Sequence, residues 1–152
     1  MKPRNAYFLV LGIVLLGTLF MKWDYISATA SNTIPYFGWC CSGTKAEAFI
    51  RTTPTNPSQA SCTIESRTIP STTINVIGWT NWQCDARLNG TPIVSSLKGG
   101  RAFPPASIAT DTTFVNYCTQ QGVCSNSVRA HGTHDFNHTG AVTNWQPYNS
   151  AT

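Results

Sequence analysis

The chain has 152 residues, of which 11% are charged and 41% hydrophobic, whereas an average soluble domain has about 25% charged residues. This composition excludes a coiled coil, a disordered charged tail and a protein that crosses a membrane many times. The net charge of +4 is small and includes Lys2 and Arg4. Because nucleic-acid-binding proteins carry a clustered basic face, we expect no nucleic-acid partner.

The N-terminal segment carries no charge over residues 6–21 and has basic residues before it. Trp23 and Tyr25 follow, and both residue types favour membrane interfaces. The pattern predicts a retained single transmembrane helix that contacts the lipid bilayer through residues 6–26. A cleaved signal peptide is the alternative, because Ala28-Thr29-Ala30 resembles its cleavage site.

Both hypotheses place the rest of the chain outside the cytoplasm, since the positive flank keeps the N-terminus inside. Residues 27–152 are then periplasmic or extracellular. We divide the chain into a membrane anchor or uncleaved signal over 1–26, an extended connector over 27–39 and a β-rich domain over 40–152.

The outer part contains short β-like runs separated by Pro and Gly. In the clearest run, alternate residues are predicted to face the core: Trp82, Cys84, Ala86 and Leu88. Asn89-Gly90 then predicts a hairpin with a return strand over 91–95, in which Pro92 must lie either on a sheet edge or among the first residues of the strand. Further strands are expected at 49–53, 61–66, 72–79, 112–118, 125–130 and 141–145. Many short strands divided by turns predict a mainly β fold, a small disulfide-stapled antiparallel β-sandwich or barrel.

All six cysteines lie beyond the predicted anchor: Cys40, Cys41, Cys62, Cys84, Cys118 and Cys124. Their even number agrees with an oxidising compartment. Cys118 and Cys124 flank a short connection that contains Gly, so we expect them to form a bridge. A bridge between the neighbours Cys40 and Cys41 would be strained. We therefore expect these two residues to bond to Cys62 and Cys84, in either order.

All three histidines fall within one short window: His131, His134 and His138. Imidazole is the commonest biological metal ligand, so a loop that holds zinc or copper, with Asp135 as a further ligand, is one hypothesis. A plain polar surface loop is the alternative. The window lacks H-E-x-x-H, and the sequence has neither G-x-S-x-G nor a P-loop. We therefore expect no enzyme activity, no catalytic residues and no cofactor other than such a metal.

Aromatic side chains and sequons offer further candidate sites. Trp39, Trp79 and Trp145 are candidates for a carbohydrate-stacking surface or a subunit contact, although core packing is the more frequent use of tryptophan. Asn89 and Asn137 each begin an N-glycosylation sequon.

An apolar N-terminal helix followed by a disulfide-bonded β-rich head is similar to the layout of type IV pilins and pseudopilins. Their leader ends in Gly and the mature chain has Glu at its fifth position, whereas this chain has Ala6 and Leu11 there. The similarity therefore lies in the layout and not in the motif. Membrane-anchored virion proteins and small accessory subunits of membrane complexes share this layout. Low charge and abundant Thr, Ser, Asn and aromatic residues favour fixed contacts, so we expect a single-pass, outward-facing structural subunit of a surface filament, virion or membrane complex, with copies of itself or other subunits as partners. The alternative function is an extracytoplasmic metal- or carbohydrate-binding module.

Overall fold

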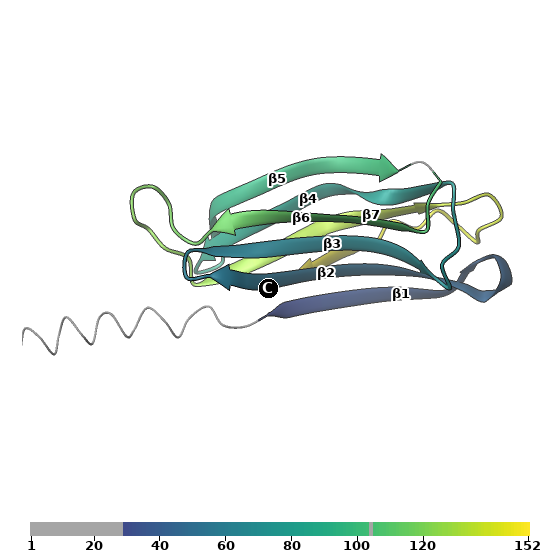
Figure 1. The fold of residues 1–152 in the computed structure, drawn as a ribbon, viewed down its shortest axis with the longest axis horizontal. Helices are drawn as coiled ribbons and strands as arrows, with labels where there is room; N and C mark the ends of the chain where they lie inside the picture. The colour runs from purple at the N-terminus through teal and green to yellow at the C-terminus, as the bar shows by residue number, and fades with distance from the viewer. Residues whose placement is uncertain (1–28, 104) are drawn as a thin grey trace, which may run out of the picture.

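The computed structural model describes residues 29–103 and 105–152, which form strands and one short 3₁₀ helix (Figure 1). The elements, in chain order, are β1 (Ala30–Cys40), η1 (Cys41–Gly43), β2 (Thr44–Asn56), β3 (Gln59–Ile69), β4 (Val76–Leu88), β5 (Thr91–Phe103), β6 (Ile108–Asn116), β7 (Ser127–Asn137) and β8 (Tyr148–Ala151). The predicted transmembrane helix lies outside the described residues. Within them, no helix has the length and hydrophobicity needed to cross a membrane.

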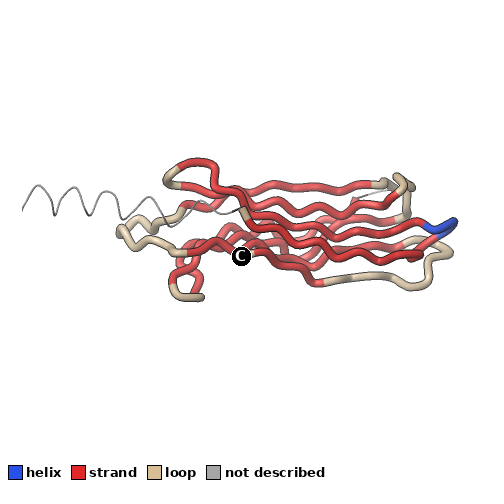
Figure 2. The backbone as a smooth tube through the Cα atoms, turned by 90° about the horizontal axis from the view of Figure 1, so that it is seen from below, coloured by secondary structure: helices blue, strands red, loops and turns tan. Residues whose placement is uncertain are grey.

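The strands form two antiparallel sheets, with the orders β1-β2-β3-β6 and β5-β4-β7-β8. The sheets face each other along their length, as the views in Figures 1 and 2 show. This arrangement confirms the predicted mainly β, antiparallel fold and makes it a sandwich of two sheets. The terminal strands β5 and β6 adjoin along one side, where Ser96 Oγ lies 2.7 Å from Thr113 Oγ1. The terminal strands β1 and β8 adjoin along the other side, where Asn149 Nδ2 donates to the Asn32 carbonyl at 3.2 Å.

The hairpin predicted at Asn89-Gly90 is confirmed. Both residues have positive φ, 50° and 82°, as a two-residue type I′ turn requires. Trp82, Cys84 and Ala86 are fully buried, as predicted. The return strand β5 is a sheet edge, as Pro92 predicts.

Leu88 is a partial exception to the predicted alternation, because it is only half-buried at the end of β4. Leu88→Ala is therefore expected to lower the free energy of unfolding by about 1 kcal/mol, less than a fully buried leucine would give. Urea unfolding of the dilute, detergent-solubilised chain measures the loss. Leu97→Ala is the matched control, since Leu97 is exposed on the paired strand, and should change the stability by less than about 0.5 kcal/mol. A loss above about 2 kcal/mol for Leu88→Ala would contradict this assignment.

Two elements expected from the sequence differ in the structure. The expected extended connector is instead a sheet strand over its described part, because Ala30–Cys40 forms β1 and pairs with β2. Its end is anchored by Trp39, which is fully buried and donates from Nε1 to the Thr143 carbonyl at 2.7 Å. The strand expected at 141–145 is instead a loop with a single bridge between Phe136 and Trp145.

The expected pairing of Cys40 and Cys41 with Cys62 and Cys84 is also wrong. Cys62 on β3 bonds to Cys84 on β4 across the two sheets, and Cys40 bonds to Cys41. The register explains the difference. Cys40 lies opposite Thr44 of β2 and Cys62 opposite Thr52, positions about 26 Å apart at about 3.3 Å per residue. No disulfide spans that distance. The Cys118–Cys124 bridge is present, as predicted.

Candidate functional site

The histidine window lies mostly on a strand and not in the expected loop. β7 contains His131 and His134, and His138 follows its last residue. Side chains alternate along a strand, so His134 faces the core while His131 and Asp135 lie on the outer face. The three imidazoles thus contact different groups and do not converge on one ion, which contradicts the predicted three-histidine metal site.

His134 is buried between the sheets and is neutral. Ser66 Oγ donates its single hydrogen to the Gly78 carbonyl at 2.7 Å and lies 2.9 Å from His134 Nδ1. The hydroxyl can therefore only accept from the ring, which places the imidazole proton on Nδ1. Nε2 is buried and has no hydrogen-bond partner within residues 29–103 and 105–152. Desolvation by burial lowers the pKa of His134 to about 4, so the ring is neutral at pH 7, and its contact with Ser66 links β7 of one sheet to β3 of the other.

His131 belongs to a polar cluster on the outer face of β4, β5 and β7. Its Nε2 lies 3.2 Å from Asp85 Oδ2. Asp85 Oδ1 accepts from Gln83 Nε2 at 2.6 Å and from Ser95 Oγ at 2.7 Å. These neighbours leave Asp85 only 1% exposed. The alternation of residues along this strand correctly predicts that Asp85 lies on the outer face. It does not show that neighbouring side chains cover Asp85.

The order of groups in this cluster limits its chemistry. In a Ser-His-Asp triad the imidazole lies between the hydroxyl and the carboxylate. Here the carboxylate of Asp85 lies between Ser95 and His131. The Ser95 hydroxyl therefore donates its hydrogen bond to the carboxylate, and the imidazole is not placed to remove the serine proton. The cluster fixes the side chains of one sheet face.

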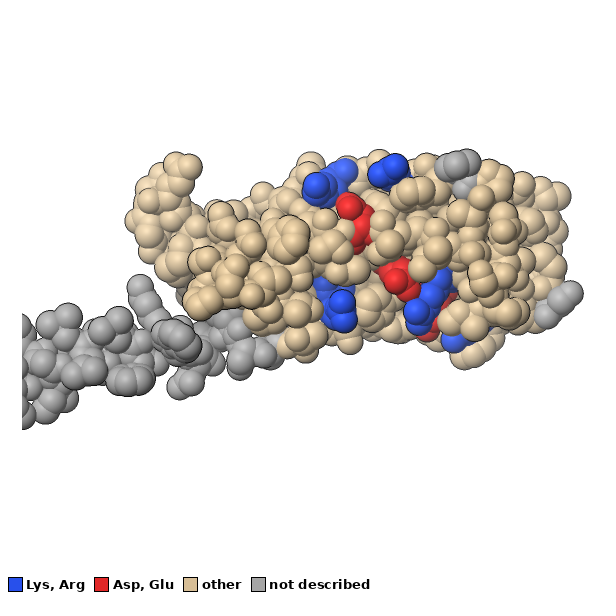
Figure 3. Space-filling model, in the orientation of Figure 1, with Lys and Arg blue, Asp and Glu red and all other residues tan. Residues whose placement is uncertain are grey.

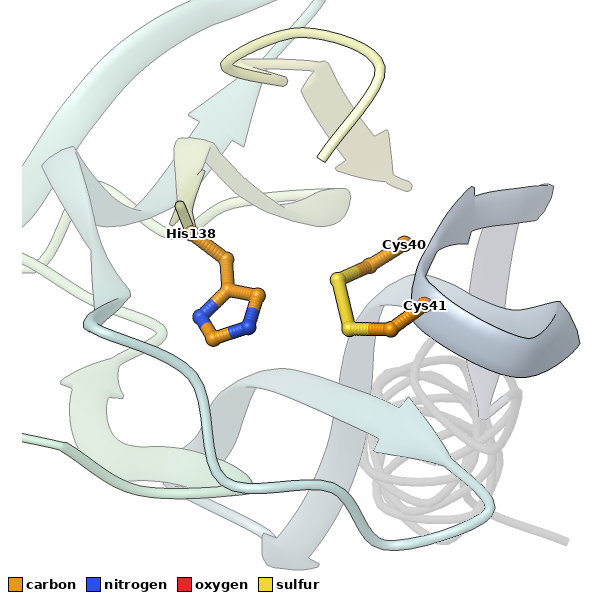
Figure 4. Close-up of side chains that lie close together, drawn as sticks. All are labelled: Cys40, Cys41 and His138. Carbon is orange, nitrogen blue, oxygen red and sulfur yellow. A yellow bond between two sulfur atoms is a disulfide. The ribbon is translucent and has the colours of Figure 1, made fainter. Parts of the chain in front are cut away.

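His138 lies beside the Cys40–Cys41 disulfide at the end of the sandwich where β1 and β7 both end (Figure 4). The possible ligand atoms of the three residues, two sulfurs and one ring nitrogen, are all within 4.8 Å of one another. Within residues 29–103 and 105–152, no other group of three His, Cys, Asp or Glu residues meets this criterion. The sequence gives no sign of this cluster, because β1 and β7 belong to different sheets and only the packing of the two sheets brings these distant residues together.

The tryptophans do not form the exposed carbohydrate-stacking surface that the sequence suggested. Trp39 and Trp79 are buried in the core. Trp145 is half-buried and packs edge-on against Tyr36, with the ring centroids 5.5 Å apart. A carbohydrate platform built from these three residues is therefore excluded. The two sequon asparagines differ in access, since Asn89 is exposed in the turn and Asn137 is half-buried.

Charged side chains gather near the middle of the sheet face seen in Figure 3, and the coloured residues at both ends of the sandwich show none in that view. On β2 and β3, Arg67 bonds to Glu47 at 2.8 Å and to Glu65 at 3.0 Å, and Lys45 lies 3.7 Å from Glu47. The hydrogen bond to Glu47 raises the pKa of Arg67. Because acids and bases pair here, the network offers no strong field to a charged ligand.

No family model matches the chain, and no curated protein or solved structure is significantly similar to it. Its class is therefore defined by architecture: an antiparallel two-sheet sandwich with three disulfides.

Proposed function

We propose that the chain is an outward-facing structural subunit of a surface filament, virion or membrane complex. Residues 6–26 act as its membrane anchor, and the sandwich contacts copies of itself or other subunits. The observation that carries this proposal is a set of large apolar side chains left exposed on a weakly charged domain. Exposed apolar side chains that gather in one patch typically mark contacts with other proteins or with membranes.

One set of exposed apolar side chains lies on β5 and β6, which adjoin along one side of the sandwich and belong to different sheets. Leu97 on β5 is 68% exposed and Phe114 on β6 is 51% exposed. Both strands are the last of their sheets, so each has one side of its backbone without a neighbouring strand in its sheet. Apolar side chains beside open strand edges favour association with another chain.

A second apolar surface lies near the end of β1. Phe37 is 74% exposed and Val142 is 71% exposed. The Val142 amide donates to the Trp39 carbonyl at 3.0 Å, which places the two side chains in the same region. Two different apolar surfaces on one molecule favour head-to-tail contacts, which produce rings or filaments.

A double substitution, Leu97→Glu with Phe114→Glu, tests the proposal in the full chain. We expect it to weaken self-association by at least tenfold, because two charges would be buried at the contact. Sedimentation of the chain purified in mild detergent measures the association. Intact mass of the same material tests the anchor, because a chain that begins at Ser31 would contradict it.

Val123→Glu is the matched control, since Val123 is also exposed but lies in the loop closed by Cys118 and Cys124. This variant should associate like the wild type. A wild-type chain that stays monomeric and has no partner in cross-linked native membranes would overturn the proposal. Equal weakening by both changes would show that the β5–β6 side is not the contact.

A further inference from the structure

The cluster of Cys40, Cys41 and His138 lies at the same end of β1 as Phe37 and Val142, but the inference drawn from it does not rest on the assembly proposal. Cys40 ends β1 and is buried, whereas Cys41 begins η1 and is exposed. In Figure 4 the imidazole of His138 faces the disulfide across a short gap. His138 Nδ1 is buried and has no hydrogen-bond partner among the described residues. Among the described residues, no hydrogen bond of this nitrogen competes with the binding of a ligand.

The Cys40–Cys41 bridge contributes less to the fold than the bridge between the sheets. A disulfide stabilises mainly by restraining the unfolded chain, and the restraint grows with the loop that it closes. Neighbouring residues close the smallest loop, whereas Cys62 and Cys84 are 22 positions apart. Reduction of the Cys40–Cys41 bridge therefore leaves the two sheets joined by the Cys62–Cys84 bridge.

The Cys40–Cys41 bridge is also easier for a reductant to reach than the Cys62–Cys84 bridge. Cys41 is exposed, while Cys62 and Cys84 are both 0% exposed. Thiol–disulfide exchange requires a thiolate to reach one sulfur of the bridge. A small dithiol reaches Cys41 in the folded protein but does not reach the bridge in the core.

We propose that reduction of Cys40–Cys41 by a dithiol creates a Cys-Cys-His site for a zinc ion. The dithiol gives two electrons and two protons to the bridge, becomes a disulfide and leaves two cysteine thiols. Zinc then replaces the two thiol protons, which pass to solvent. Two thiolates and one imidazole are a ligand set that zinc prefers over an all-oxygen shell.

The geometry suits this coordination. Zinc lies about 2.3 Å from sulfur and about 2.0 Å from nitrogen, so ligand atoms around one ion are somewhat under about 4 Å apart. The three donor atoms here already lie within 4.8 Å of one another. Small side-chain rotations therefore suffice once the bridge opens. The exposed position of Cys41 leaves room for water as the fourth ligand.

The test uses the full chain with Cys118→Ser and Cys124→Ser, which removes the other bridge with an exposed cysteine. The chain is treated with dithiothreitol without oxygen, the reagent is removed, and zinc is titrated against a chromophoric chelator. We expect one zinc ion per reduced chain and none per oxidised chain. Alkylation and peptide mapping should label Cys40 and Cys41 and leave Cys62 and Cys84 unlabelled.

Ligand variants make the test specific. His138→Ala should weaken zinc binding by at least tenfold, and Cys41→Ser should abolish it. His131→Ala is the matched control and should bind zinc like the parent, because His131 pairs with Asp85 elsewhere. Circular dichroism confirms that each reduced variant is folded. A folded, reduced chain that takes up no zinc, or a His138→Ala variant that binds as tightly as the parent, would overturn the proposal.

Discussion

Replacing Cys62 and Cys84 together by alanine is expected to lower the free energy of unfolding by about 3 kcal/mol. The bridge joins β3 of one sheet to β4 of the other and has a sequence separation of 22, and loops of this length give about that loss of restraint in the unfolded chain. Both side chains are fully buried, so alanine also leaves space in the core. Denaturant unfolding followed by tryptophan fluorescence measures the change.

The pair Cys118→Ala and Cys124→Ala is the control for this result. Its bridge has a sequence separation of only 6, and the same dependence on loop length gives an effect about 1 kcal/mol smaller. Cys118 is also exposed, so its loss opens little space in the core. Equal losses for the two pairs would show that the bridge between the sheets does not act through chain restraint.

The parts of the fold that the sequence predicts well are those where the two faces of a strand differ. Trp82, Cys84 and Ala86 alternate with polar residues, and Asn89-Gly90 demands positive φ, so the hairpin follows from local physics. β1 was missed for the opposite reason. Its first half is exposed over Ser31–Thr33, and it is held in place by pairing with β2 and by the buried Trp39.

The candidate sites depend on strand register, which local patterns do not determine. Sequence proximity suggests that His131, His134 and His138 act together, whereas strand alternation turns the first two to opposite faces. The packing of one sheet on the other brings His138 to Cys40, which is remote in sequence. One sequence shows that the residue types for such a site are present. It does not show how far apart they lie in the folded chain.

Lowering the pH from about 7 to about 4 should destabilise the wild-type chain through His134. Its pKa is about 4 in the folded protein because burial disfavours the charged ring, against 6.5 for the ordinary side chain. The unfolded chain therefore takes up the proton first. The stabilisation is complete above about pH 6.5 and is lost as the pH falls towards 4. At about 1.4 kcal/mol per pKa unit, the loss from this residue is about 3 kcal/mol.

His134→Asn isolates this contribution, because the asparagine amide can replace the Nδ1 donor towards Ser66 Oγ but does not titrate. We expect the variant to be less stable than the wild type at pH 7, since its smaller side chain leaves space in the core. Between pH 6.5 and 4 its stability should fall by about 3 kcal/mol less than that of the wild type. His131→Ala should keep the wild-type dependence on His134, because His131 lies on the outer face beside Asp85. If His134→Asn loses stability with falling pH as steeply as the wild type, then the buried imidazole is not the group that the acid protonates.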